Sequence, residues 1–538
     1  MDCDYIVVGA GSAGCVVASR LSETGASVVL LEAGPKDWHP FIHIPAGVLR
    51  LLYNPAVNWM YATDPEPGTA NRSIHWPRGR VLGGSSSING MLFVRGNPAD
   101  YDAWAQMGCR GWSYADCLPH FKSIERYAPG DEEHRGKSGP LLLEDYRTVL
   151  PLTHRFVEAA QQAGFKFTKD LSGEQPEGVG YSQMSRNGRF RGSTARTFLA
   201  AAKGRPNLRV ETSAFTTRLH FDGKRCTGVE FRKGGASGPL HTLRANREVI
   251  VSGGTINSPH LLQVSGIGPA AHLKSIGVDV VHDLPGVGAN LGDHYATRVS
   301  ARVKGAVSIN QLARGLGLAK ELVKFVFRGN GALTFGVSSA QIFCRSREGL
   351  AAPDIQLLFS PATYDEGKFG ELEREPGITV AVSIARPESR GTIMAKSADP
   401  FVRPSLKPNY LSASNDMRVA LAGIGHVRRI FAQPALAPHF VRETLPGKDV
   451  QGDDELQDFV RRTGTTIYHI VGTCKMGEDP MAVVDPRLRV RGIAGLRVVD
   501  ASIMPAVTTG NTNAPTIMIG EKASRMIIED AKAVTVAA

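Results

Sequence analysis

The chain has 538 residues, too many for one simple hydrophobic core, which predicts two interleaved domains or one large domain with insertions. Hydrophobic residues make up 42% and charged residues 21%, a balance that suggests neither a disordered chain nor a membrane-spanning one. The net charge of +11 favours anionic ligands or an anionic membrane surface. Because the basic residues are spread along the chain, without zinc-finger or RNP-like motifs, we expect no nucleic-acid partner.

The seven cysteines are an odd number and form no C-x-x-C pair, which argues against a disulfide framework and against a zinc site. The first predicted strand begins at Asp4, so we expect no cleaved signal peptide. No uncharged apolar stretch is long enough for a spanning helix. We therefore expect a cytoplasmic protein without a bound metal, and peripheral attachment to the inner membrane is the alternative.

The N-terminal segment, residues 4–34, has the pattern strand, glycine-rich turn, helix, strand, which predicts one βαβ unit. Gly9, Gly11 and Gly14 form G-x-G-x-x-G directly after the first strand, where glycine allows a tight turn and close approach of the backbone to a pyrophosphate. Glu32 follows near the spacing of ~20 residues at which an acid binds a ribose hydroxyl. The pattern predicts a site for FAD or NAD and disfavours NADP, whose 2′-phosphate the acid would repel.

Two longer motifs lie at residues 78–96 (RGRVLGGSSSINGMLFVRG) and 254–268 (GTINSPHLLQVSGIG). They closely resemble the two signatures of the glucose-methanol-choline (GMC) flavoenzymes, and the resemblance continues through residues 283–294, 468–477 and 498–516. It is strongest to the bacterial alcohol and choline-type dehydrogenases of that family. One departure is Gly292, where related sequences often carry glutamine.

The resemblance implies an α/β fold (α+β overall) in which a Rossmann-like FAD-binding domain is interleaved with a substrate domain built on an antiparallel sheet flanked by helices. We expect residues 1–155, 190–300 and 460–538 to form the FAD-binding domain, and residues 156–189 and 301–459 to form the substrate-binding domain. Alternating runs at 354–360 and 377–383 are typical of strands of such a sheet. Pro515, ahead of an apolar-periodic segment, predicts the first turn of a C-terminal helix.

The resemblance also implies non-covalent FAD, because the histidine that tethers the flavin in some relatives is replaced here by Ile88. The small residues after Arg80 let the chain pass close to a planar ring. For Asp500, a role in forming a turn is the alternative to contact with the cofactor. The residues that we expect to contact FAD are Gly9, Gly11, Ser12, Ala13, Gly14, Glu32, Ala33, Arg80, Gly83, Gly84, Ser85, Asn89, Gly90, Met91, Leu92, Phe215, Gly253, Asp500, Ala501, Asn511, Asn513 and Thr516.

Alcohol oxidation requires a base, because an alcohol is about as weak an acid as water, with a pKa of ~15.7, and hydride leaves an alkoxide far more readily. Histidine, with an ordinary pKa of ~6.5, suits this task. The resemblance identifies His469 as the base that removes the hydroxyl proton while hydride passes to flavin N5. It places Asn513 at the second catalytic position, where an amide orients the substrate oxygen. Asn511 stands two residues away, and helix capping is the alternative role for either asparagine.

The substrate is expected to be a primary alcohol that is oxidised to the aldehyde, with a quinone-type acceptor or oxygen as the oxidant. A flavin-dependent hydroxynitrile lyase on the same scaffold is the alternative function. Aliphatic, polyether, aryl or furan and choline-like alcohols all stay open, with choline least favoured because no acid and aromatic cage for its ammonium can be located. Residues 41–53 are a candidate lid. Residues 312–327 form a basic amphipathic pattern that predicts either a helix lying on a membrane or a helix packed on the sheet.

Overall fold

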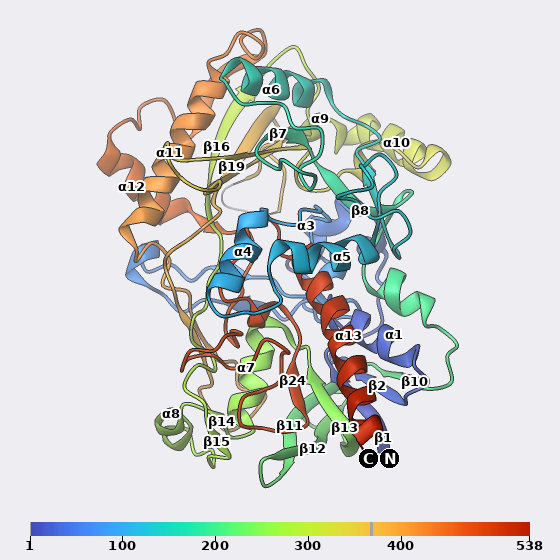
Figure 1. The fold of residues 1–538 in the computed structure, drawn as a ribbon. Helices are drawn as coiled ribbons and strands as arrows, with labels where there is room; N and C mark the ends of the chain where they lie inside the picture. Colours follow the sequence, from blue (N-terminus) through green and yellow to red (C-terminus); the bar gives the residue numbers. More distant parts are fainter. Residues whose placement is uncertain (1, 366–369, 538) are drawn as a thin grey trace.

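The computed structural model describes residues 2–365 and 370–537. Two large sheets dominate the fold, the first in the lower half and the second in the upper half of Figure 1. Both sheets draw strands from distant parts of the chain, so that neither is built from one continuous segment.

The first sheet is mostly parallel and has the strand order β10-β2-β1-β13-β12-β11, with β24 beside β13. The predicted βαβ unit is confirmed, because β1 and β2 are parallel neighbours joined by α1 (Gly14–Ser22). Asp500 follows β24 closely. The bounds of the strands are β1 Asp2–Val8, β2 Val28–Leu31, β10 Leu208–Glu211, β11 Ala214–Asp222, β12 Arg225–Lys233, β13 Leu240–Val251 and β24 Leu496–Val498.

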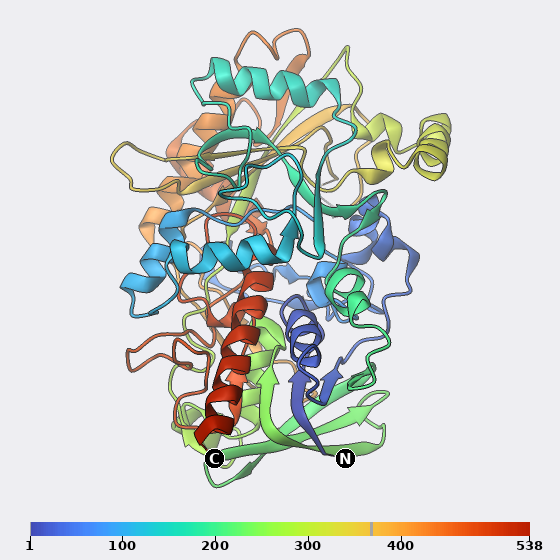
Figure 2. The same cartoon turned by 45° about the vertical axis from the view of Figure 1, so that its right-hand side comes forward.

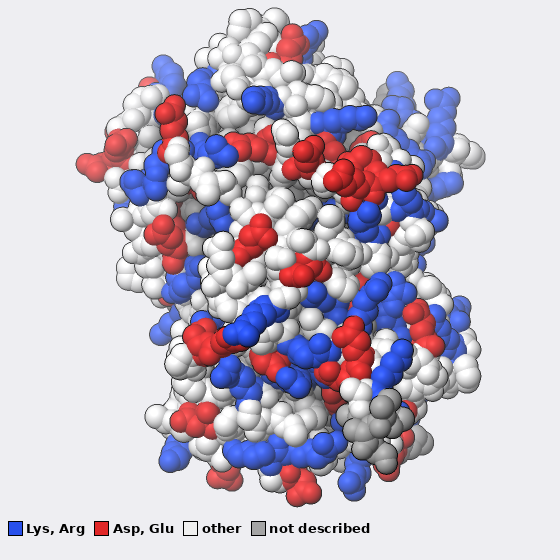
Figure 3. Space-filling model, in the orientation of Figure 1, with Lys and Arg blue, Asp and Glu red and all other residues white. Residues whose placement is uncertain are grey.

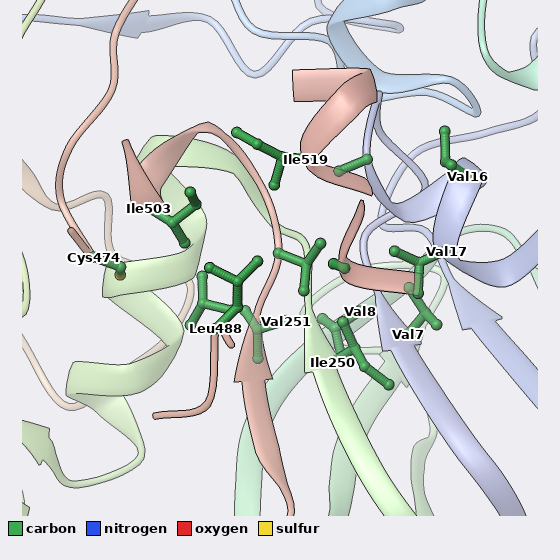
Figure 4. Packing of buried hydrophobic residues seen from close by; sticks show 14 of the residues in the cluster. Val7, Val8, Val16, Val17, Ile250, Val251, Cys474, Leu488, Ile503 and Ile519 are labelled. Atoms are coloured by element: carbon green, nitrogen blue, oxygen red, sulfur yellow. The ribbon is translucent and has the colours of Figure 1, made fainter. Parts of the chain in front are cut away.

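Helices bury this sheet, which explains why its central strands are apolar on both faces. Val7 of β1 lies opposite Ile250 of β13, and both are fully buried. Figure 4 shows these side chains packed among residues of α1, of α13 (Asn513–Ala537) and of the chain around Leu488. In Figures 1 and 2 α13 lies beside α1, and Pro515 occupies its first turn as predicted.

The second sheet is antiparallel throughout its described pairs and has the order β22-β16-β19-β18-β17-β7, with β23 beside β16. The strands predicted at 354–360 and 377–383 are confirmed as β18 and β19, which are neighbours. The mixed α/β class is confirmed as well. The bounds are β7 Gly178–Tyr181, β16 Tyr295–Val303, β17 Ala340–Cys344, β18 Ile355–Ser360, β19 Gly377–Ile384, β22 Phe440–Leu445 and β23 Thr465–Thr466.

Successive side chains of a strand point to opposite faces, and this alternation gives the second sheet two different surfaces. On β18, Ile355, Leu357 and Phe359 join the core beneath α6 (Pro151–Gln162) and α11 (Ser414–Phe431), against which α12 (Asp453–Thr463) packs. Leu358 and Ser360 point to the other face and line a cavity. One face therefore holds the helices, and the other is free to form a binding site.

The remaining elements lie outside the two large sheets. They are α2 Pro40–His43, η1 Pro45–Gly47, α3 Val48–Leu51, β3 Tyr61–Ala62, η2 Pro67–Thr69, β4 His75–Trp76, η3 Gly84–Ser87, α4 Pro98–Gln106, α5 Tyr114–Ile124, β5 Glu125–Arg126, β6 Leu141–Asp145, β8 Gln183–Asn187, β9 Phe190–Arg191, η4 Ala195–Leu199, α7 Gly254–Val264, β14 Ile267–Gly268, α8 Ala270–Ser275, β15 His282–Asp283, α9 Ile309–Leu312, α10 Gly315–Val323, η5 Lys324–Arg328, η6 Ala332–Thr334, β20 Thr392–Met394, β21 Ser405–Lys407 and η7 Ala501–Ile503.

The segment predicted as an amphipathic helix forms α10 and the single π-helical turn η5. Leu316 and Phe327 are among its most exposed side chains, which is not the pattern of a helix packed on the sheet. Within the described residues, no helix combines the length and the apolar character needed to cross a bilayer. The seven cysteines are free and buried.

Candidate active site

A cavity of about 390 Å³ lies between the two sheets. Its walls come from the glycine-rich turn after β1, from the end of β2, and from the inner face of β16, β18 and β19. Val48, Leu49 and Leu52 also line it, so the segment that we expected to be a lid does contribute to the wall.

The glycine-rich turn is closely packed on one side and open on the other. A Cβ atom at Gly9 would lie 2.4 Å from the carbonyl oxygen of Ser252, and one at Gly14 would lie 1.9 Å from that of Gly9. A Cβ atom at Gly11 would meet nothing within 4 Å. Gly11 therefore presents its backbone to open space in the cavity, as the approach of a pyrophosphate requires.

Glu32 holds the turn in shape from the end of β2. Its carboxylate accepts hydrogen bonds from the backbone N–H groups of Ala10 (3.0 Å) and Gly34 (2.8 Å). Burial raises the pKa of Glu32 to about 7, although the two N–H groups and Arg80 act in the opposite direction. Since a carboxylate oxygen can accept more than one hydrogen bond, capacity is left for ribose hydroxyls.

The second motif packs directly on the glycine-rich turn. Gly83 has a φ of +89° and donates its N–H to the carbonyl oxygen of Ala10, and a Cβ atom at Gly84 would lie 2.7 Å from the Cα of Gly11. Asn89 accepts hydrogen bonds from the N–H of Met91 and from Arg191. Small residues at 83 and 84 are therefore needed for the two loops to meet at the cavity.

The two asparagines near the C-terminus have different partners. Asn513, at the start of α13, accepts a hydrogen bond of 2.7 Å from the hydroxyl of Ser12 in the glycine-rich turn. Asn511 Nδ2 lies 3.0 Å from Nε2 of His469. The structure therefore brings Asn511 to the predicted base, whereas the described contacts of Asn513 join α13 to the cofactor side of the cavity.

The neighbours of His469 select one tautomer of its imidazole ring. Nε2 of His294 lies 3.0 Å from the carbonyl oxygen of Ala385, an acceptor, so this nitrogen carries a proton. In the neutral ring Nδ1 of His294 is then an acceptor, and it lies 2.9 Å from Nδ1 of His469. His469 must donate from Nδ1, which leaves the lone pair of its Nε2 directed at Asn511 and the cavity.

The carboxylate of Asp293 holds His294 and His469 in place through their backbone. One carboxylate oxygen accepts hydrogen bonds from the backbone N–H groups of His294 and His469, both at 2.9 Å, and the other accepts from the hydroxyls of Thr466 and Tyr410. Burial raises the pKa of Asp293, while these hydrogen bonds and Arg78 lower it. The carboxylate thus fixes the backbone that carries both imidazoles.

Burial keeps both imidazoles neutral. It lowers the pKa of His469 well below its ordinary value, and the neighbouring His294 and Arg78 act in the same direction. Burial likewise lowers the pKa of His294 to about 4. At neutral pH His469 is therefore unprotonated on Nε2, the state that a general base requires.

The inner face of the second sheet orients Asn511. Gln356 of β18 donates to Asn511 Oδ1 at 3.3 Å and to Oε1 of Gln341 at 2.8 Å, and Gln341 of β17 in turn donates to the hydroxyl of Ser182. Gln341, Gln356 and Ser182 are fully buried. Because Oδ1 of Asn511 is used as an acceptor, its NH₂ group must face His469.

Most of the residues predicted to contact the cofactor line the cavity. Three do not: Gly14 packs beneath the glycine-rich turn, Gly83 shapes the adjoining loop, and Arg80 lies over the ring of Trp59. Asp500 lines the cavity but also bonds to Gly254 N–H and to Ser258. The predicted residues that line it are Gly9, Gly11, Ser12, Ala13, Glu32, Ala33, Gly84, Ser85, Asn89, Gly90, Met91, Leu92, Phe215, Gly253, Asp500, Ala501, Asn511, Asn513 and Thr516.

Several site residues were missed by sequence reasoning. His294 and Arg78 lie inside motifs that were recognised, but nothing in their spacing indicated a contact with residues near 469. Gln356 and Arg298 lie on strands, where alternation can show that they share a face but not what that face meets. Trp59 and Tyr468 also line the cavity.

Comparison with known proteins shows which protein family the chain matches. Residues 3–296 match the N-terminal model, and residues 387–520 the C-terminal model, of a family described as GMC oxidoreductase. The chain is 43% identical to an oxygen-dependent choline dehydrogenase of Brucella ovis, over 98% of this chain and 96% of the relative, and 42% identical to an alcohol dehydrogenase [acceptor] of Pseudomonas putida, over 98% and 95%. A structure titled for FAD modification in the formate oxidase of Aspergillus oryzae superimposes with a TM-score of 0.92 at 26% identity, covering 99% of both chains. Since the match extends over both halves of the chain and includes every motif that builds the cavity, the protein belongs to the GMC oxidoreductase family.

Proposed function

We propose that this protein is an FAD-dependent oxidoreductase that oxidises a primary alcohol to the aldehyde, with His469 as the base. The observation that supports it most directly is the fixed protonation of His469, whose Nε2 faces the cavity without a proton beside the amide of Asn511. Two relatives are named as an alcohol dehydrogenase and a choline dehydrogenase, which supports an alcohol as the substrate class.

The residues of the cavity fit FAD. The open backbone at Gly11 suits a pyrophosphate, Glu32 suits a ribose, and the N-terminus of α13 supplies a positive dipole end with Asn513 and Ser12 beside it. Ile88 is buried among Ile42, Val81 and other apolar side chains, and an alkyl side chain offers no bond to a flavin, which supports non-covalent binding. When bound, FAD would supply the two-electron acceptor.

We assign the protein groups as follows. The alcohol hydroxyl enters between Asn511 and His469 and replaces the hydrogen bond between them. Asn511 donates an N–H to the oxygen, and His469 Nε2 takes the hydroxyl proton. His294 keeps the Nδ1 proton of His469 in place by accepting its hydrogen bond, and Asp293 holds the backbone of both histidines. This assignment transfers the orienting role that the sequence predicted for Asn513 to Asn511.

For the reoxidation step we propose a quinone-type acceptor or oxygen. Of the two relatives, one is named oxygen-dependent, which supports oxygen, and the other is named for an acceptor that the name does not specify. Nothing in the comparisons favours the hydroxynitrile lyase alternative.

The proposal is tested by mixing the oxidised holoenzyme with a series of primary alcohols in the absence of oxygen. Loss of the visible absorbance of oxidised flavin is expected with at least one of them. His469→Ala should slow this reduction by ~10²-fold or more, the usual scale for a general base. His154→Ala, at an exposed histidine remote from the cavity, is the matched control. No flavin reduction with any alcohol, or an unchanged rate in His469→Ala, would contradict the proposal.

A further inference from the structure

The segment formed by α10 and η5 projects from the rest of the protein. Figures 1 and 2 show α10 standing out at the right-hand side of the upper half of the fold, which contains the second sheet. Its large apolar side chains are open to solvent: Leu316 is 82% exposed, Leu322 47%, Val323 56%, Val326 52% and Phe327 80%. Few soluble surfaces concentrate so many exposed apolar side chains in a stretch of twelve or so residues.

The spacing places several of these side chains on one side of the segment. Leu316 and Val323 are seven residues apart, and Phe327 follows four residues later, which is the repeat of a single helical face. Among the described residues, α10 packs chiefly on α9, η5 and η6, through which it is tied to the protein. The apolar face is therefore turned away from the core.

The charges around this face have one sign. Arg314, Lys320, Lys324 and Arg328 are exposed, and Figure 3 shows basic side chains over the same projection. The one acid between residues 309 and 331 is Glu321, which is buried and bonded to the N–H of Ala332 and to Lys324. Exposed apolar side chains bordered by basic ones match an anionic lipid surface, where both kinds of side chain find partners.

The surface continues toward the lid of the cavity. Phe190 packs edge-on against Phe325, Arg196 lies over the ring of Phe190, and Arg189 bonds to backbone oxygens of η5. β9, which carries Phe190, contacts α2, and η6 contacts η1. Residues Trp38 and Phe41 beside these elements are exposed as well. The candidate lid, residues 41–53, thus lies next to the projecting segment.

We propose that residues 314–328 dock the protein on the surface of an anionic phospholipid bilayer. The apolar side chains enter the boundary between headgroups and acyl chains, and the basic ones contact lipid phosphates. Pairing with a second copy fits less well, because a two-fold contact of this surface would bring Lys320 and Arg328 toward the same basic residues. Docking in this way turns the lid toward the bilayer, where apolar alcohols and lipid-soluble acceptors dissolve. The docking itself does not depend on the proposed reaction.

The test is sedimentation of the holoenzyme with vesicles of phosphatidylcholine alone or mixed with phosphatidylglycerol. Wild type is expected to sediment with the mixed vesicles and far less with the neutral ones. The double variant Leu316→Ser/Phe327→Ser should lose binding to both. Lys320→Glu/Arg328→Glu should weaken binding to the mixed vesicles by ~10-fold or more, because two side chains that attract the anionic lipids are replaced by side chains that repel them.

The matched controls are Val441→Ser/Met481→Ser, at exposed apolar positions elsewhere, and Lys448→Glu, at an exposed lysine elsewhere. Both should bind as wild type does. All variants are first compared for flavin content, thermal unfolding and activity with a soluble dye, so that misfolded protein is recognised. The proposal is overturned if wild type does not bind mixed vesicles, or if the serine double variant binds as well as wild type. It is also overturned if sedimentation velocity shows a dimer that this variant dissociates, since the face would then join two copies.

Discussion

Nδ1 of His294 and Nδ1 of His469 lie 2.9 Å apart, although the residues are 175 positions apart in the chain. Two neutral imidazoles can share this contact only if one donates and the other accepts, and the carbonyl oxygen of Ala385 makes His294 the acceptor. His294, which does not line the cavity, thus decides which ring nitrogen of His469 carries the proton.

Replacing His294 by Phe removes the acceptor and leaves Nδ1–H of His469 buried without a partner. The ring can then carry its proton on Nε2, where it cannot act as base, so the rate of flavin reduction should fall by ~10²-fold or more while flavin content is unchanged. His294→Gln, whose amide can both accept and donate, should retain more activity. Equal rates in the two variants, measured by rapid mixing with alcohol, would show that the proton position does not matter.

The activity of wild type should persist well below pH 6.5. Burial lowers the pKa of His469 well below its ordinary value, so the base is protonated, and the activity lost, only as the pH falls through that lowered value. The measurement is kcat/KM from neutral to acid pH, with enzyme stability checked at each point. An acid limb centred at or above pH 6.5 would disagree with the burial of this ring.

Asn511 and Asn513 should separate chemistry from cofactor binding. Asn511→Ala removes the amide beside His469 and is expected to slow flavin reduction by ~10-fold or more without loss of FAD. Asn513→Ala removes the partner of Ser12 and should weaken the retention of FAD during gel filtration, with a smaller effect on the rate of enzyme that keeps it. If Asn513→Ala instead slows flavin reduction and Asn511→Ala instead loses FAD, then Asn513 and not Asn511 orients the substrate oxygen.

Gly11 and Gly14 should tolerate a side chain differently. A side chain at Gly11 meets open space, so Gly11→Val is expected to fold but to be purified without flavin. Gly14→Ala places a Cβ 1.9 Å from the carbonyl oxygen of Gly9 and should lower the melting temperature of the protein whether or not FAD is added. Flavin content by absorbance and thermal unfolding distinguish the two effects. Full flavin content in Gly11→Val would mean that the cofactor does not approach this backbone.

The charge of the cavity should disfavour choline. Arg78 and Arg298 line it, and its acids within the described residues are Glu32 and Asp500, both bonded to backbone N–H groups on the cofactor side. A quaternary ammonium is repelled by nearby arginines, so kcat/KM for 3,3-dimethylbutan-1-ol, the neutral analogue of choline, should exceed that for choline by ~10-fold or more. Arg298→Gln should lower the ratio of kcat/KM for the neutral analogue to kcat/KM for choline. A preference for choline in wild type would reject the prediction.

Acid should destabilise the fold partly through His120. Burial, with Lys522 and Arg525 nearby, lowers the pKa of His120 to about 4, whereas in the unfolded chain it is ~6.5. The unfolded state therefore binds more protons between these values, so stability falls as the pH falls from 6.5 toward 4. His120→Gln should remove up to ~1 kcal/mol of this loss at pH 5, a modest figure because His120 is only partly buried. The free energy of unfolding of wild type and of His120→Gln is measured with denaturant at pH 7 and pH 5. An equal loss of stability in wild type and in the variant between these pH values would refute the prediction.

The sequence by itself determined the elements whose side-chain periodicity is local. The βαβ unit with Glu32 at its end, strands β18 and β19, and the helix that begins near Pro515 were all predicted from patterns that span a few residues. The motif around His469 was recognised differently, by its resemblance to a motif of the GMC family. Such patterns survive in the sequence because alternation and helical repeats reflect which face of each element is buried.

Tertiary structure alone decided how these elements meet. Asn511 and Asn513 stand two positions apart. The packing of α13 against the glycine-rich turn directs Asn513 to Ser12, whereas Gln356 of the second sheet directs the amide of Asn511 to His469. His294 and Gln356 reach the site through contacts across more than 150 residues, which no local spacing encodes. The exposure of Leu316 and Phe327 is of the same kind, since an amphipathic pattern states that a face is apolar but not whether the rest of the protein covers it.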